Sequence, residues 1–118
     1  MNSEKILKVV ANALDDIKAK DIITLNVKGL TSITDVIIVC SGTSTRHVKA
    51  IKDRILEYSA KEKIKPLGVE GEQEGEWVLV DLNEVIIHIM MPEIRSFYQL
   101  EKLWDIEPKK TKGSSHEN

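Results

Sequence analysis

One stretch in the middle of the chain decides the fold, Asp35-Val36-Ile37-Ile38-Val39-Cys40-Ser41-Gly42-Thr43-Ser44. Its first half is an unbroken apolar run, which is typical of a central strand that is covered on both faces. Ser41-Gly42 then ends the strand, and Thr43 or Ser44 provides an N-cap for a helix. We therefore expect a central strand, a short turn and a helix in direct succession.

Upstream of this stretch, the sequence predicts one helix and one strand. Ser3 is a suitable N-cap, and apolar residues recur at helical spacing from Ile6 to Ile17, which predicts a helix that ends at about Lys20. The short β-branched segment 22–27 predicts a strand, and Lys28-Gly29 after it is a turn signal.

Downstream, the second helix carries an apolar stripe. The stripe consists of Val48, Ile51, Ile55 and Tyr58. Strands are predicted at about 67–70, 77–82 and 85–90, and Asn83-Glu84 joins the last two as a tight hairpin. Pro92 begins a last helical stretch that continues through Trp104. The order α-β-β-α-β-β-β-α predicts an α/β (α+β) fold, in which helices flank a mixed five-stranded sheet.

The composition predicts one domain and a reducing, cytoplasmic location. We assign residues 1–107 to a single domain and expect the polar tail 108–118 to be disordered, because it has almost nothing apolar to bury. With one cysteine, the 118-residue chain forms no internal disulfide. The first twenty residues lack the long apolar run of a signal peptide or a membrane helix.

The charge distribution argues against nucleic acid as the main partner. The tail carries three lysines against one glutamate, which leaves residues 1–107 with a net charge of −4 out of a total of −2. Affinity for phosphate backbones comes largely from lysine and arginine. We therefore expect no membrane partner and no sequence-specific binding of nucleic acid.

Two glutamates raise the possibility of a metal-dependent nucleotidyltransferase. Glu70 and Glu72 would share one face of an extended strand and could hold a divalent metal, with Ser41 in the Gly-Ser turn. However, such enzymes place their carboxylates about a dozen residues after the turn, whereas a whole helix separates Gly42 from Glu70. This reading stays open as the alternative function.

The remaining reactive side chains do not form a catalytic set. The three histidines lack metal-ligand spacing with one another or with Cys40, which we expect to be a small buried hydrophobe. His88 shares a strand face with Ile86 and Met90, which is typical of a hydrogen-bonded core or interface residue. We therefore predict no catalytic residue, no cofactor and no metal.

An acidic stretch from Glu70 to Glu84 is the strongest sign of a binding surface. It contains six acids, whereas neither lysine nor arginine occurs between Leu67 and Ile94. These acids are Glu70, Glu72, Glu74, Glu76, Asp81 and Glu84. Trp77 lies directly beside them, and a large aromatic next to uncompensated charge has the composition of an interface anchor with a steering rim.

Several blocks of the sequence, in a fixed order, match a known family. The blocks are Leu30-Thr31-Ser32-Ile33-Thr34-Asp35, Ser41-Gly42-Thr43-Ser44, Val69-Glu70-Gly71, Trp77-Val78-Leu79-Val80-Asp81, His88-Ile89 and Pro92-Glu93-Ile94-Arg95-Ser96-Phe97-Tyr98-Gln99-Leu100-Glu101-Lys102-Leu103-Trp104. Together they resemble the ribosomal silencing factor family (RsfS, also called Iojap-like). The resemblance implies a nucleotidyltransferase-like fold without the working carboxylates. It also implies binding to the fourteenth protein of the large ribosomal subunit, which blocks small-subunit joining and represses translation under nutrient limitation, and a homodimer when free.

From this resemblance and from residue chemistry we predict a partner-binding set with Trp77 as its anchor. The set consists of Glu70, Trp77, Asp81, Arg95, Tyr98 and Glu101. The glutamates between the matched blocks, Glu72, Glu74 and Glu76, should only adjust the electrostatic field. A dimeric scaffold without a ribosomal role is a third reading of the sequence.

Overall fold

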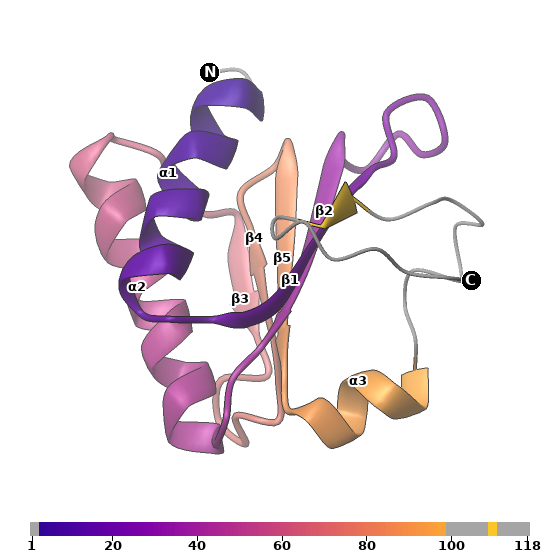
Figure 1. Cartoon of the computed structure of the whole chain (residues 1–118). Helices are drawn as coiled ribbons and strands as arrows, with labels where there is room; N and C mark the ends of the chain where they lie inside the picture. Colours follow the sequence, from indigo (N-terminus) through magenta and orange to yellow (C-terminus); the bar gives the residue numbers. More distant parts are fainter. Residues whose placement is uncertain (1–2, 99–108, 111–118) are drawn as a thin grey trace.

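The computed structural model describes residues 3–98 and 109–110 of the chain. Its elements are α1 (Ser3–Asp16), β1 (Lys20–Asn26), β2 (Val36–Ser41), α2 (Thr45–Lys61), β3 (Gly68–Glu70), β4 (Trp77–Asp81), β5 (Val85–Met90), α3 (Pro92–Tyr98) and β6 (Lys109–Lys110). The predicted order of helices and strands is confirmed, and Figure 1 shows how they are arranged.

The sheet is mixed, as predicted, with the strand order β3-β4-β5-β2-β1-β6. β2 and β5 pair in parallel, and the other neighbours pair antiparallel. Every residue of β2 is buried, which fits a strand in the middle of the sheet. The two-residue strand β6 pairs with β1 and was not predicted. Residues 111–118 lie outside the described residues, so the predicted boundary between a domain 1–107 and a disordered tail stays a prediction.

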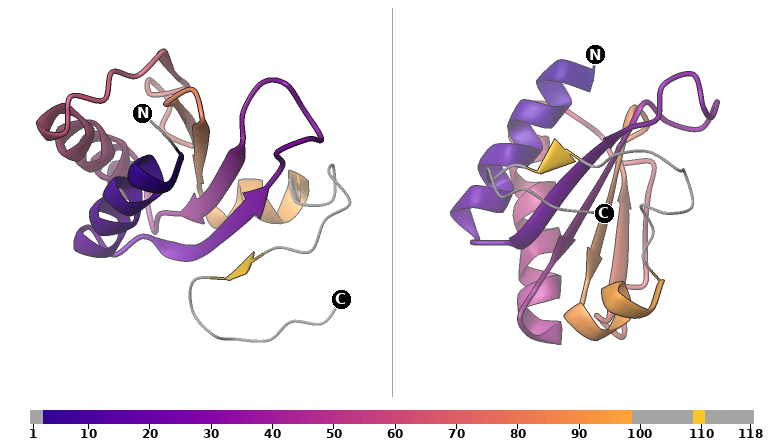
Figure 2. Two further views of the ribbon diagram at one scale, coloured as in Figure 1. Left: turned by 90° about the horizontal axis from the view of Figure 1, so that it is seen from above. Right: turned by 45° about the vertical axis from the view of Figure 1, so that its right-hand side comes forward.

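The helices form layers on the two sides of the sheet. α1 and α2 lie together over one face, while α3 lies on the opposite side of the sheet, near its lower end in Figure 1 (Figures 1 and 2). The larger apolar cluster fills the space between the sheet and the two long helices, where Val48, Ile51 and Ile55 of the predicted stripe are fully buried. A smaller cluster on the other face includes Leu25, Val39 and Met90 of β1, β2 and β5.

Each of the two long helices is followed, two residues after its last residue, by a lysine with left-handed backbone. α1 ends at Asp16 rather than at about Lys20, because Lys18 has φ +59° and the Ala19 N–H donates to the Leu14 carbonyl at 2.9 Å. Lys63 has the same φ after α2, and the Ile64 N–H donates to the Ser59 carbonyl. This helix ending usually contains glycine, so the sequence held no stop signal at Lys18.

Cys40 is buried at the centre of the sheet, as predicted. Burial raises the pKa of its thiol to about 12. The thiol is therefore protonated at physiological pH and is a poor nucleophile.

Candidate protein-binding surface

The sheet face opposite α1 and α2, which we call the α3 face, carries three of the predicted partner-binding residues. Side chains alternate along a strand, and the buried Val78 and Val80 point toward α2, so Trp77 and Asp81 point to the α3 face. The register pairs Glu70 with Leu79 and Leu79 with His88, which places these three side chains in one row across β3, β4 and β5.

Trp77 is half-buried at the first position of β4 and contacts two kinds of neighbour. Its ring packs against the smaller apolar cluster, alongside Ile94 of α3. Its indole Nε1–H donates a hydrogen bond to Nδ1 of His88 on β5 at 2.9 Å. The two ring centroids are 5.9 Å apart and the ring planes are inclined by 54°. Trp77 is thus fixed by both packing and a directed bond.

His88 is a neutral acceptor in this pair. Burial lowers the pKa of its imidazole from 6.5 to about 4, since the charged ring would lose its hydration. The prediction that His88 is a hydrogen-bonded core or interface residue is confirmed. Alternation along residues 85–90 placed His88 on the correct face, but only the register between β4 and β5 shows that it meets Trp77.

Gly71 allows the chain to turn back beside Trp77. Its φ is +79°, and a Cβ atom at this position would lie 2.1 Å from the Trp77 carbonyl oxygen. Only glycine adopts this conformation readily and also permits such a close approach. The bend at Gly71 therefore determines the position of the Trp77 backbone at the start of β4.

Asp81 and Arg95 have structural contacts of their own. Asp81 lies at the far end of β4 from Trp77, where its Oδ1 accepts a hydrogen bond from the Asn83 N–H at 2.9 Å. This bond supports the hairpin turn, in which Asn83 has φ +78°. Arg95 of α3 donates to Ser41 Oγ at 3.2 Å and to the Asp21 carbonyl, so it ties α3 to the ends of β2 and β1.

The other two members of the predicted set are Tyr98 and Glu101. Tyr98 is the last residue of α3, but its side chain lies outside the described residues, as does Glu101. The structure thus brings Glu70, Trp77 and Asp81 to one sheet face and places Arg95 at one end of the sheet.

The acidic stretch is less one-sided than its sequence suggests. Glu72 forms an ion pair with Lys52 of α2 at 3.1 Å, and the Lys52 side chain is only 13% exposed. Hydrogen bonds to Asp53 and then to Glu72 raise the pKa of Lys52, although burial opposes this. The compensating charge comes from a helix that is distant in sequence, so the description of Glu72 as uncompensated was wrong.

This pairing also separates the two carboxylates of the nucleotidyltransferase alternative. Glu70 lies on β3 in the same row as Leu79, whereas Glu72 lies beyond the bend at Gly71 and pairs with α2. Ser41 is 1% exposed and accepts the bond from Arg95. Among residues 3–98 and 109–110, we find no group of three or more His, Cys, Asp or Glu side chains that could hold a metal ion.

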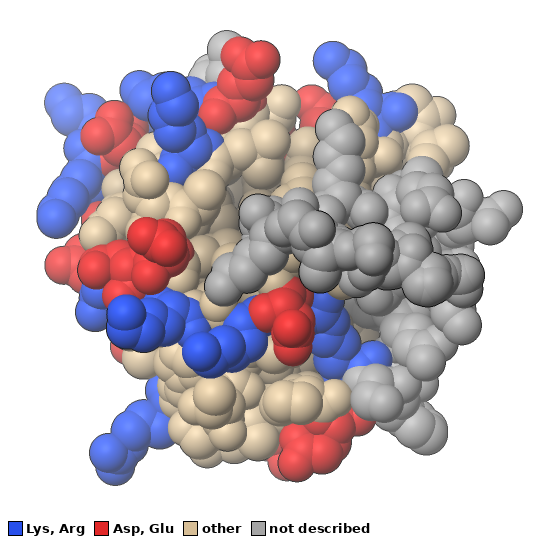
Figure 3. Space-filling view, viewed as in Figure 1, with Lys and Arg blue, Asp and Glu red and all other residues tan. Residues whose placement is uncertain are grey.

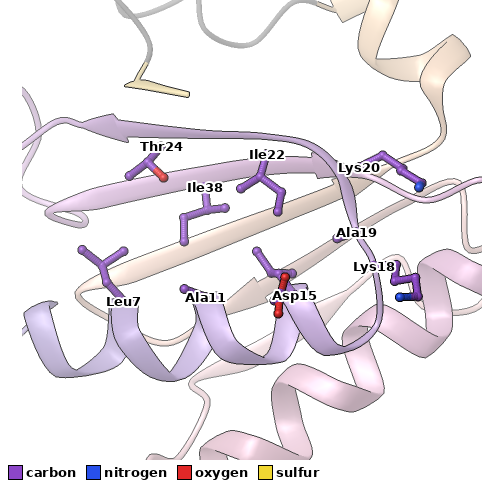
Figure 4. A pocket seen from close by; sticks show the side chains of 10 residues that line it. Leu7, Ala11, Asp15, Lys18, Ala19, Lys20, Ile22, Thr24 and Ile38 are labelled. Atoms are coloured by element: carbon purple, nitrogen blue, oxygen red, sulfur yellow. The ribbon is translucent and has the colours of Figure 1, made fainter. Parts of the chain in front are cut away.

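A groove of about 620 Å³ lies on the other side of the sheet, between α1 and β1. Figure 4 shows Leu7 and Ala11 of α1 across from Ile22 and Ile38 of the strands. Its ionisable residues are Asp15, Lys18 and Lys20, near the C-terminal end of α1. The groove is thus an apolar hollow on the helix side, separated by the sheet from Trp77.

The surface over the two long helices carries both signs of charge. Basic and acidic side chains are interspersed there in Figure 3, in the same view as Figure 1. Ion pairs contribute to this pattern, including Lys5 with Glu62 and Arg54 with Asp16. A surface of mixed sign is a weak match for a phosphate backbone. No helix in the described part of the chain is long and apolar enough to cross a membrane.

Comparison with known proteins gives a consistent result over nearly the whole chain. The family model "Ribosomal silencing factor during starvation" matches residues 1–118. The ribosomal silencing factor RsfS of Bacillus subtilis is 40% identical over 108 residues, which is 92% of each chain. The mouse protein named mitochondrial assembly of ribosomal large subunit protein 1 is 32% identical over 103 residues, which is 85% of this chain and 45% of the mouse protein.

Solved structures agree with the fold. A crystal structure of a Chromobacterium violaceum protein superposes with a TM-score of 0.86 at 39% identity, and the match covers 96% of this chain and 95% of that one. A crystal structure of a Bacillus halodurans protein gives a TM-score of 0.79 at 34% identity, over 86% of this chain and 95% of that one.

Proposed function

Since the chain belongs to the ribosomal silencing factor family, with a role in ribosome assembly or translation regulation, we propose that it binds the large ribosomal subunit and sterically blocks joining of the small subunit. The contact is with the fourteenth protein of the large subunit. Binding represses translation under nutrient limitation, it takes place in the cytoplasm, and the free protein is a homodimer. No catalytic step is needed for this action.

The observation that carries the proposal is the family match over residues 1–118. The name of the mouse relative supports a large-subunit partner in particular, because it assigns that protein to assembly of the large subunit. The α3 face supplies a suitable surface: Trp77 is a half-buried aromatic held in place, and the exposed Glu70 lies on the neighbouring strand.

The structure also suggests different roles within the predicted set. We propose that Trp77 and Glu70 touch the partner, while Asp81 and Arg95 mainly hold the hairpin and α3 in position. Tyr98 and Glu101 stay predicted contact residues. The ion pair with Lys52 compensates the charge of Glu72, so we assign it no contact with the partner and only a weak effect on the electrostatic field.

Subunit binding tests the proposal directly. Purified large subunits should co-sediment with the protein at physiological salt, and pre-bound protein should reduce the yield of joined ribosomes when small subunits are added. Absence of co-sedimentation would refute the proposal. Binding that leaves joining unaffected would refute the steric mechanism alone.

Trp77→Ala should weaken this binding by more than about 2 kcal/mol, because a central aromatic anchor contributes disproportionately to an interface. The matched control is Ile33→Ala, which removes a 70% exposed apolar side chain from the β1–β2 loop. Dissociation constants from a titration of labelled protein with large subunits would measure both effects. Equal losses for the two variants would place the anchor elsewhere.

Salt should have only a modest effect on binding. An acidic body that contacts a ribosomal protein releases few counterions from RNA, so the logarithm of the affinity should fall with the logarithm of salt concentration with a slope shallower than about −2. Titrations between low and physiological salt measure this slope. A steep loss would show that several phosphate contacts contribute, and the tail lysines would then be the first candidates.

A further inference from the structure

The hydrogen bond between Trp77 and His88 fixes the chemical state of both rings. An indole N–H can only donate, so Nδ1 of His88 must present its lone pair, and the proton of the neutral imidazole is on Nε2. A protonated imidazole has no free lone pair and could not accept this bond. The low pKa of His88, about 4, keeps the acceptor in place at physiological pH.

The same bond fixes the orientation of the indole. Trp77 pairs in register with Met90, and His88 lies two residues before Met90 on β5, so the two rings meet diagonally across the strand pair. Packing against the apolar cluster restrains the position of the indole ring. The directed N–H···N bond at 2.9 Å fixes its orientation, because Nε1 must face His88. A side chain that is ordered before binding loses less conformational entropy when the partner arrives.

The location of the pair makes this orientation relevant to binding. Trp77 and His88 are both half-buried, so each ring is partly accessible on the α3 face. Glu70 on β3 lies in the same row as His88 but two strands away. Burial accounts for the low pKa of the imidazole.

We propose that His88 is a positioning residue for partner binding: its Nδ1 atom holds the Trp77 indole in the orientation in which the ring meets the large-subunit protein. This inference rests on the proposed function, because it takes Trp77 as the anchor of that contact. His88 acts through Trp77 and needs no contact of its own with the partner.

Two substitutions separate the acceptor from the ring. His88→Leu introduces an apolar side chain of similar bulk and removes the acceptor, whereas His88→Asn can place its amide oxygen where Nδ1 lies. We expect His88→Leu to weaken binding to large subunits about fivefold, which is the usual size of a lost hydrogen bond. His88→Asn should restore the affinity to within about twofold of the wild type.

A Trp77→Phe background supplies the matched control, because phenylalanine keeps an aromatic ring but has no N–H to donate. In this background His88→Leu should leave the affinity unchanged. The indole N–H signal of Trp77, followed by NMR on tryptophan labelled with ¹⁵N, should shift in His88→Leu and return toward its original position in His88→Asn. The signal of Trp104, the other tryptophan of the chain, serves as an internal reference.

Each outcome bears on one claim. An equal loss from His88→Leu in both backgrounds, or wild-type affinity for His88→Leu, would overturn the positioning role while leaving the proposed function intact. Failure of the wild-type protein to bind large subunits would overturn the proposed function. The role assigned to His88 in that contact would then fall as well. Loss dependent on the indole N–H, together with rescue by asparagine, would establish the inference.

Discussion

At the scale of single residues, a half-buried histidine and a buried serine differ in how their polar atoms are satisfied. His47 satisfies both of its ring nitrogens: Nδ1 accepts the Thr43 N–H, and Nε2 donates to the Ile17 carbonyl, each at 2.9 Å. It thereby joins the end of α1 to the start of α2. Ser59, in contrast, is fully buried, and its Oγ has no hydrogen-bond partner among the described residues.

Ser59→Ala should therefore stabilise the protein. Removal of a buried hydroxyl without a partner eliminates its desolvation cost, so we expect the free energy of unfolding to rise by about 1 kcal/mol. Urea denaturation followed by circular dichroism measures this change. Ala60→Ser, at the exposed neighbouring position, is the control and should change stability little. A clear loss of stability in Ser59→Ala would show that the hydroxyl has a stabilising partner.

His88 should make stability depend on pH between about 4 and 6.5. Its pKa in the folded protein, about 4, lies below the unfolded value of 6.5, so the unfolded chain binds the additional proton in this range. Stability is then fully present above pH 6.5 and falls as the pH drops toward 4, by up to about 3 kcal/mol from this group. Denaturation of wild type and His88→Asn across this range measures the difference. Parallel pH profiles for the two proteins would rule out His88 as the source.

At the scale of elements, the sequence predicted most strands well because their signals are local. The segment 85–90 coincides with β5, and the apolar run in the middle of the chain became the fully buried β2. The ends of the helices were less predictable. Lys18 adopts left-handed backbone without a glycine, so only the hydrogen bond from Ala19 to Leu14 reveals where α1 stops.

The bend between β3 and β4 should be sensitive to a single methyl group. Gly71→Ala would combine a left-handed φ with a contact of 2.1 Å to the Trp77 carbonyl, so we expect unfolding to become easier by more than about 2 kcal/mol. Gly29→Ala is the matched control, because Gly29 has φ +87° but nothing lies within 4 Å of its added Cβ. That change should cost about 1 kcal/mol from backbone strain alone. Equal losses on thermal unfolding would mean that the loop relaxes around the new methyl group.

At the scale of the whole molecule, the candidate site depends on contacts that no local pattern contains. The sequence placed Glu70, Trp77 and Asp81 on strands but did not show that they share one face of the sheet. It could not show that Lys52 neutralises Glu72, that Arg95 reaches Ser41, or that the Trp77 indole meets His88, because each contact joins different elements. Register and helix placement decide such contacts, and both are set by the packed fold.

The parallel pairing of β2 with β5 has a consequence for how the protein is made. Val36 pairs with Val85, so the centre of the sheet joins segments separated by about two-fifths of the chain. Such distant contacts close late, since much of the intervening chain must be ordered first. A nascent chain that has not yet reached β5 lacks both His88 and the middle of its sheet. The partner-binding surface therefore forms only after β5 has been made, because a shorter chain lacks the strand and the imidazole that hold Trp77 in place.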